Sequence, residues 1–262
     1  MTWRRTIGRV EFVNCEPLFY NIDPSWKVLP APPAWLTGHL LRKDCILAPI
    51  PAADYARHHK ELVLVPDIAI SSKGEVGSVL LLGTMKLSEM KSIALPTDSA
   101  TSVALLKFLL KTHKLNPTLI EMGPDLKMML NECDGCLLIG DRALEAAHSH
   151  PELEILDLGS QWRELSGLPM VFGVFATRRD SNIEDVKEAH RELLLRLNIF
   201  ENDPIIRRKV LELSAKKSNQ SLARMDKYFG EVINRMDNED LQGLTAFLRM
   251  GCGLATEAEF AW

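Results

Sequence analysis

The chain has no apolar stretch long enough to cross a bilayer, and its first residues show neither the apolar core nor the small-residue cleavage site of a secretory signal. We therefore expect a cytoplasmic protein without a membrane partner. A strong charge bias is missing too, since 31 basic and 35 acidic residues give a net charge of -4. Such a balance provides no general attraction to nucleic acid, so we expect no nucleic-acid partner.

Signatures of nucleotide and metal chemistry are also missing. The sequence contains no P-loop, no G-x-G-x-x-G run and no H-E-x-x-H motif. Its 5 cysteines are an odd number. Cys133 and Cys136 have the C-x-x-C spacing, but no second pair completes a zinc site, and two small core residues around a turn are the simpler interpretation. We expect free thiols, no metal and no cofactor.

The remaining composition is that of an ordinary globular protein, with 46% hydrophobic and 25% charged residues in 262 positions. That length allows one large domain or two lobes. Up to about residue 176, short apolar runs alternate with short amphipathic segments, which predicts an α/β chain. The expected strands are 7–13, 45–48, 62–65, 76–82, 92–95, 118–121, 135–139, 153–156 and 170–176. The expected helices among them are 33–41, 51–58, 102–111, 124–131, 141–147 and 160–165.

The pattern changes after residue 178, where apolar residues recur at helical spacing. The predicted helices of this tail are 181–200, 204–217, 221–236 and 240–250. No Pro/Gly/Ser-rich linker precedes them, so we expect the tail to pack on part of the α/β structure and not to form a separate domain.

Five segments of the chain, in order, resemble one known family. They are 9–18 (RVEFVNCEPL), 65–70 (VPDIAI) with 74–79 (GEVGSV), 98–105 (DSATSVAL), 124–126 (PDL) through 138–144 (LIGDRAL), and 157–172 (DLGSQWRELSGLPMVF). The chain is similar in these segments to the MqnA family of menaquinone biosynthesis, which consists of chorismate dehydratases of the futalosine pathway.

The resemblance implies a two-lobed fold like that of type II periplasmic binding proteins, with the helical C-terminal region packed on the first lobe. The long apolar strands 76–82 and 170–176 would carry the chain out of the first lobe and back. The expected first lobe is 1–83 plus 178–262 and the second is 84–177, with the ligand in the cleft between them. The implied activity is removal of water from chorismate, giving 3-[(1-carboxyvinyl)oxy]benzoate.

Two polar residues carry the catalytic assignment that the resemblance implies. Asn14 follows an apolar strand, where its amide can donate and accept hydrogen bonds. Ser78 lies in the predicted strand 76–82, where a hydroxyl can face the cleft. The Asn and Ser of these two motifs are implicated in catalysis in the family. Without the resemblance, a turn-stabilising Asn and an ordinary strand Ser remain open alternatives.

The candidate substrate-binding residues lie at two helix starts. Ser99, Thr101 and Ser102 precede or open a predicted helix, where hydroxyls and backbone N–H groups can hold a carboxylate. Simple helix capping is the alternative for all three. Gly140 and Asp141 lie at the start of the candidate helix 141–147, and an Asp there is commonly a cap too.

No His, Lys or carboxylate pair in these motifs is an obvious base. The resemblance implies that the side-chain carboxylate of the substrate takes the proton, while the protein supplies placement and hydrogen bonds. The related 1,4-dihydroxy-6-naphthoate synthases share the fold and use a histidine base in the second lobe, but the comparable segment here, 139–144, contains no histidine. A cytoplasmic, non-catalytic solute-binding or sensor module also remains open. The expected partner is the small-molecule substrate, for a monomer or a homodimer.

Overall fold

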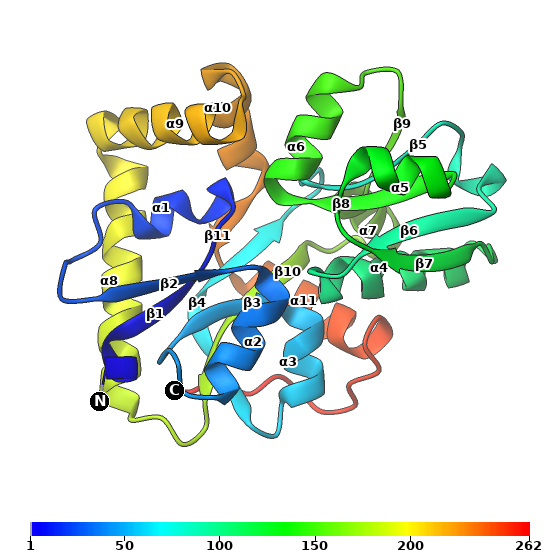
Figure 1. Ribbon diagram of the computed structural model, residues 1–262. Helices are drawn as coiled ribbons and strands as arrows, with labels where there is room; N and C mark the ends of the chain where they lie inside the picture. The colour runs from blue at the N-terminus through cyan, green and yellow to red at the C-terminus, as the bar shows by residue number, and fades with distance from the viewer. Residues whose placement is uncertain (1) are drawn as a thin grey trace.

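The computed structural model describes residues 2–262, apart from the side chain of Glu154. The chain forms two α/β lobes that lie side by side, and both termini lie in the first of them (Figure 1). The first lobe contains η1(Thr2–Arg5), β1(Thr6–Val10), η2(Val13–Cys15), α1(Glu16–Phe19), β2(Lys27–Ala31), α2(Pro33–Leu41), β3(Ala48–Pro51), α3(Ala52–His58), β4(Leu62–Ser72), β10(Met170–Arg178), α8(Ile183–Asn202), α9(Pro204–Ser218), α10(Leu222–Glu231), β11(Ile233–Arg235) and α11(Asn238–Met250).

The second lobe is the central part of the chain. It contains β5(Val79–Gly83), η3(Leu87–Glu89), β6(Ser92–Pro96), α4(Ala100–Thr112), β7(Thr118–Met122), α5(Leu126–Glu132), β8(Gly135–Ile139), α6(Gly140–Ser149), β9(Glu154–Asp157) and α7(Leu158–Ser166). Its strands form one sheet in the order β7-β6-β8-β5-β9. The strands β5 and β8 are buried at every position because helices cover both faces of this sheet.

The first lobe contains two sheets joined by short contacts. One has the strand order β11-β4-β10-β3, and the other pairs β1 with β2 in parallel. The backbone N–H of Gly8 donates to the carbonyl oxygen of Leu47 at 2.8 Å, which links β1 to the segment that enters β3. Gly8 has no space for a Cβ there, since Ala48 lies against it. The hydrophobic core runs through both lobes, with a smaller cluster on the far face of the second sheet.

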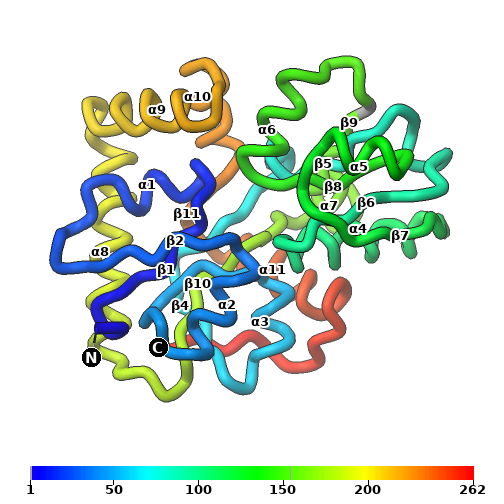
Figure 2. The backbone as a smooth tube through the Cα atoms, in the orientation of Figure 1, coloured from blue at the N-terminus to red at the C-terminus, as the bar shows by residue number. Residues whose placement is uncertain are grey.

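The links between the lobes differ from the predicted boundaries. β5 pairs with β8 and β9 of the second sheet, and β10 pairs with β3 and β4 of the first. The chain therefore passes between lobes at 73–78 and at 167–169, so the expected boundaries at 83 and 178 are wrong by the length of one strand. An apolar run predicts a buried strand but does not say which sheet it joins. The two links are visible as a pair in the tube view (Figure 2).

The helical tail packs on the first lobe, as predicted. α8 lies along α1, and α11 lies on β10 and α3. The predicted helix 221–236 is wrong at its C-terminal end, because residues 233–235 form β11 and pair with β4. The apolar residues Met225, Phe229, Val232 and Met236 keep helical spacing, but the open edge of β4 offers backbone partners that the sequence pattern does not reveal.

Candidate functional site

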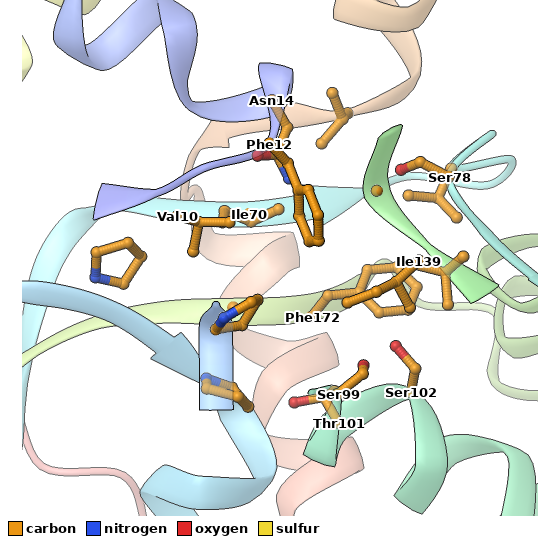
Figure 3. Close-up of a pocket in the computed structure, with 18 of the residues that line it drawn as sticks. Val10, Phe12, Asn14, Ile70, Ser78, Ser99, Thr101, Ser102, Ile139 and Phe172 are labelled. Carbon is orange, nitrogen blue, oxygen red and sulfur yellow. The ribbon is translucent and has the colours of Figure 1, made fainter. Parts of the chain in front are cut away.

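A small cavity of about 60 Å³ lies between the lobes. That volume is smaller than the roughly 300–1,000 Å³ of ordinary small-molecule sites. Figure 3 shows its labelled residues converging from both lobes and from the 73–78 link. The lining residues are Val10, Phe12, Asn14, Pro33, Pro49, Ile50, Pro51, Ile70, Val76, Ser78, Val79, Ser99, Thr101, Ser102, Ile139, Gly140, Phe172, Gly173 and Val232. Six of the seven predicted site residues are therefore in one place.

Asn14 enters the cavity from η2, the short turn after β1. The side chain is 7% exposed, and its Oδ1 atom has no hydrogen-bond partner among the described residues. An unpaired buried acceptor is costly, by about 1–3 kcal/mol. A ligand that donates a hydrogen bond to Oδ1 would remove this cost. The turn-stabilising alternative for Asn14 is not supported, because Oδ1 bonds to no backbone group of the turn.

Ser78 lies in the 73–78 link, directly before β5, and is 3% exposed. The sequence predicted it within a strand, whereas the structure has a bend here. Asp157 holds the link from the second lobe by accepting hydrogen bonds from the backbone N–H groups of Val76 at 3.1 Å and Gly77 at 2.8 Å. Tyr228 of α10 donates a hydrogen bond to Ser78 Oγ at 2.9 Å. Ser78 is thus fixed from both lobes.

Ser99, Thr101 and Ser102 form a hydroxyl cluster at the start of α4, and all three side chains are buried. Ser99 is the N-cap residue, but its side chain makes no capping hydrogen bond. The Thr101 Oγ1 atom accepts a hydrogen bond at 3.1 Å from the backbone N–H of Ala53, in the other lobe. Simple capping therefore does not explain Ser99 or Thr101. The hydroxyls line the cavity, and Thr101 also ties the lobes together.

Gly140 and Asp141 lie where α6 meets η2 of the first lobe. Gly140 has a φ of +61°, and the ring of Phe12 occupies the space that a Cβ would need. Asp141 is the predicted site residue that does not line the cavity. Its Oδ1 atom accepts a hydrogen bond from the backbone N–H of Val13 at 3.0 Å. Burial raises the pKa of the Asp141 carboxyl, and the Val13 N–H partly opposes that shift.

The cavity has no charged side chain among its described lining residues. An anionic ligand would therefore be held by hydroxyls, an amide and backbone N–H groups. Charged residues lie just outside, in a groove between the lobes that shares Ser99 with the cavity. This groove follows the outer face of α4 and contains Arg57, Lys107 and Lys111, together with Glu121.

Sequence reasoning missed several residues of the site. Phe12 and Phe172 form much of the apolar wall, and neither carries a sequence signal for a binding site. Tyr228 was missed because its only signal, an aromatic residue at helical spacing, predicts core packing. Trp162 carries the same signal and is a core residue with 0% exposure. Only the three-dimensional contact to Ser78 distinguishes Tyr228 from Trp162.

Within residues 2–262, the structure has no cluster of three or more His, Cys, Asp or Glu side chains suited to a metal ion. None of the described helices is long and apolar enough to span a membrane. The cysteines are free thiols in the described chain, and burial raises the pKa of Cys15 and Cys136 to about 12. Neither thiol is suited to act as a nucleophile at neutral pH.

Residues 5–252 match the protein family described as menaquinone biosynthesis. The chain belongs to this family. The chorismate dehydratase of Thermus thermophilus is 32% identical to it, and the alignment covers 92% of this chain and 93% of that protein. The family assignment made from five segments is thus confirmed over nearly the whole length.

Solved structures show the same fold at low sequence identity. An Archaeoglobus fulgidus protein has a TM-score of 0.78 at 19% identity, covering 94% of this chain and 95% of its own. The alkanesulfonate-binding protein SsuA of Xanthomonas axonopodis pv. citri, bound to MOPS, has a TM-score of 0.66 at 14% identity and covers 98% and 96%. A Candida albicans protein described as having the generic periplasmic binding protein fold has a TM-score of 0.68 at 12% identity and covers 96% and 91%. The predicted binding-protein-like fold of this family member is confirmed.

Proposed function

We propose that the chain is a chorismate dehydratase that eliminates water from chorismate to give 3-[(1-carboxyvinyl)oxy]benzoate, and so is a hydro-lyase. The observation that carries this proposal is the largely apolar cavity between the lobes, with uncharged polar groups in its lining, in a member of the menaquinone biosynthesis family, together with the 32% identical chorismate dehydratase. Location in the cytoplasm and a monomeric or homodimeric state stay predictions.

The reaction needs a largely apolar cavity that contains a few correctly placed polar groups. The C–H bond at the ring carbon that carries the enol ether breaks, the neighbouring C–OH bond breaks, and the released electron pair completes an aromatic ring. Charge that develops on the way can spread over the ring toward its carboxylate. Aromatisation makes the elimination favourable, so the protein has to supply mainly placement and hydrogen bonds.

The two walls of the cavity fit the two ends of this substrate. The hydroxyls of Ser99, Thr101 and Ser102, with the backbone N–H groups at the start of α4, can hold a carboxylate. Phe12 and Phe172 offer apolar surfaces for the ring. Asn14 and Ser78, both of which lie above the α4 hydroxyls in Figure 3, would orient the reacting atoms.

We propose that the substrate's own side-chain carboxylate takes the proton. In support, the described lining contains no Asp, Glu, His, Lys, Cys or Tyr that could act as a base in direct contact. The same observation disfavours a 1,4-dihydroxy-6-naphthoate synthase, which uses a histidine base. Asn14 and Ser78 are then assigned to orientation and to stabilisation of developing charge, and neither is assigned proton abstraction.

The test is incubation of the purified protein with chorismate, followed by mass spectrometry and ultraviolet spectroscopy. Loss of one water with the appearance of a substituted benzoate spectrum is the expected result. Binding of chorismate without turnover would support the solute-binding or sensor alternative. Neither binding nor turnover would overturn the proposed substrate, while the fold and the family would stand.

A further inference from the structure

Resting on the proposed function, we propose that Tyr228 is a positioning residue that directs the hydroxyl of Ser78 to donate its hydrogen bond to the bound substrate. The helical tail contacts the 73–78 link through this pair of residues. Tyr228 lies in α10, far from Ser78 in sequence, and its hydroxyl is 2.9 Å from Ser78 Oγ. Tyr228 is 0% exposed.

The direction of this hydrogen bond follows from the available partners. A buried tyrosine hydroxyl carries one proton that must be donated, since an unmade buried hydrogen bond is costly. Ser78 Oγ is the one acceptor within hydrogen-bond distance of the Tyr228 hydroxyl among the described residues. Tyr228 is therefore the donor and Ser78 Oγ the acceptor.

The remaining hydrogen-bond capacity of Ser78 then faces the cavity. A serine hydroxyl has one proton and two lone pairs, and Tyr228 occupies one lone pair. The Ser78 proton has no described acceptor in the protein, while Ser78 lines the cavity. A substrate oxygen would accept this proton. In such a chain, the first hydrogen bond also polarises the second and strengthens it.

Two other side chains of α10 also lie close to the link, at Gly77. Arg224 forms an ion pair with Glu231 at 2.8 Å, and its guanidinium lies 5.6 Å from the ring centroid of Tyr228. The ends of both side chains occupy the space that a Cβ at Gly77 would need, and Gly77 has a φ of +66°. Because residue 77 is a glycine, Arg224 and Glu231 of α10 can pack against the link directly beside Ser78.

Burial raises the pKa of Tyr228, so the phenol stays protonated over the pH range in which the protein would work. Tyr228 and Ser78 therefore form a chain of donors, and neither group serves as a base. A donor fixed before the reaction begins stabilises charge that develops in the transition state, so we expect its loss to affect kcat more than KM.

The experiment compares Tyr228→Phe with Tyr55→Phe, using chorismate as substrate. Tyr55 is a matched control because it is also 0% exposed, and its hydroxyl makes one hydrogen bond, from the backbone N–H of Glu259 at 2.8 Å, without lining the cavity. Each variant loses the one hydrogen bond that the hydroxyl of its buried tyrosine makes, so a decrease in Tm is expected for both. We expect Tyr228→Phe to lower kcat about tenfold with KM within about twofold, and Tyr55→Phe to change neither.

A double-mutant cycle with Ser78→Ala gives the second readout, measured in single turnovers with enzyme in excess so that slow rates are accessible. With Ser78 absent, Tyr228→Phe should lower the rate no further. An equal kcat for the two Tyr→Phe variants would overturn the inference, as would the same loss from Tyr228→Phe in both backgrounds. A wild-type protein without turnover would instead overturn the proposed function, and the inference with it.

Discussion

The two walls of the cavity are built from different chemistry. The first lobe contributes carbon surfaces from prolines, aliphatic residues, Phe12 and Phe172, with Asn14 as the polar lining side chain among its described residues. The second lobe contributes the hydroxyl cluster Ser99, Thr101 and Ser102 at the start of α4. Ser78 lies between them, in the link that joins the lobes.

From this difference we propose that the second lobe binds a substrate carboxylate, whereas the first lobe contributes to the chemical step. Several equivalent hydroxyls next to a helix N-terminus suit an anion that is held equally in ground state and transition state, which changes KM. A single amide with an unpaired oxygen, set in an apolar wall, suits one specific atom of the substrate. Loss of the second-lobe hydroxyls should therefore raise KM, whereas loss of the Asn14 amide should lower kcat.

The largest expected effect comes from Asn14→Ala. This change removes the polar side chain of the first-lobe wall, and we expect kcat to fall by about 10²–10³, as for the loss of one preorganised hydrogen-bonding group. Since Oδ1 has no partner in the described protein, its removal costs no internal hydrogen bond there. We expect the Tm of the variant to equal or exceed that of the wild type.

Asn234→Ala is the matched control for Asn14. Asn234 is 6% exposed, lies in β11 outside the cavity lining, and its Nδ2 atom is 3.5 Å from the carbonyl oxygen of Ala69. The control should lower Tm and leave kcat unchanged. A fall in Tm for Asn14→Ala that is as large as that of the control would indicate a structural amide and would remove the contrast between the walls.

The next effect comes from the double change Ser99→Ala and Ser102→Ala. It removes two hydroxyls of the second-lobe wall, and we expect KM to rise about tenfold while kcat falls less than threefold, because the contacts are made equally before and during the reaction. Ser149→Ala, in the exposed end of α6 of the same lobe, is the control. A loss confined to kcat would contradict the division of labour.

Thr101 sharpens the comparison because its hydroxyl also joins the two walls. Thr101→Val keeps the shape but leaves the backbone N–H of Ala53 without its acceptor, whereas Thr101→Ser keeps the hydroxyl. A lost hydrogen bond of this kind costs about 1 kcal/mol, so we expect about fivefold weaker chorismate binding for Val and a value near wild type for Ser. Small-angle scattering should show a larger radius of gyration for the unliganded Val variant, and an unchanged radius would contradict a role in lobe closure.

Much of the fold was predictable because local signals and global packing agree. The helix 33–41 was predicted with the bounds that α2 has, and most others within about two residues. β2 was missed because Lys27–Ala31 has no alternation and contains a proline. The sequence assigned β5 and β10 to the wrong lobes, because the pairing of a strand depends on partners that are distant in sequence.

The candidate site was predictable where polar residues follow apolar strands or open helices, as Asn14 and Ser99 do. The family resemblance supplied the choice among many such residues. Asp141 was predicted as a substrate contact but bonds to Val13, since a helix-opening carboxylate reaches whichever N–H group lies nearest. Tyr228 had no local signal, because the role proposed for it depends on one hydrogen bond to Ser78 in the 73–78 link, 150 residues away in sequence.

The hydrogen bond between Asp141 and Val13, which joins the two lobes, gives a pH test. Because burial raises its pKa above the ordinary 3.8, the folded protein holds the proton to higher pH than the unfolded chain does. The free energy of unfolding therefore falls as pH rises from the ordinary pKa through the raised one, and then levels off. Asp141→Asn keeps an acceptor for Val13 without the charge, so its Tm should match that of the wild type in acid and exceed it near neutral pH. A constant difference in Tm at all pH values would contradict this account.

The smallest expected effect concerns the groove outside the hydroxyl wall, where Lys107 and Lys111 lie on the outer face of α4. Chorismate carries two negative charges, and a positive surface beside the cavity raises the rate of encounter without contacting the bound ligand. We expect the double change of both lysines to Glu to lower kcat/KM about threefold at low ionic strength with kcat unchanged, and the difference to disappear at high salt. Lys127→Glu makes a change of the same kind on α5, which lies on the other face of the second sheet, and should have no effect. A loss that persists at high salt would mean that a lysine contacts the substrate directly, and the hydroxyl wall would then not bind the carboxylates alone.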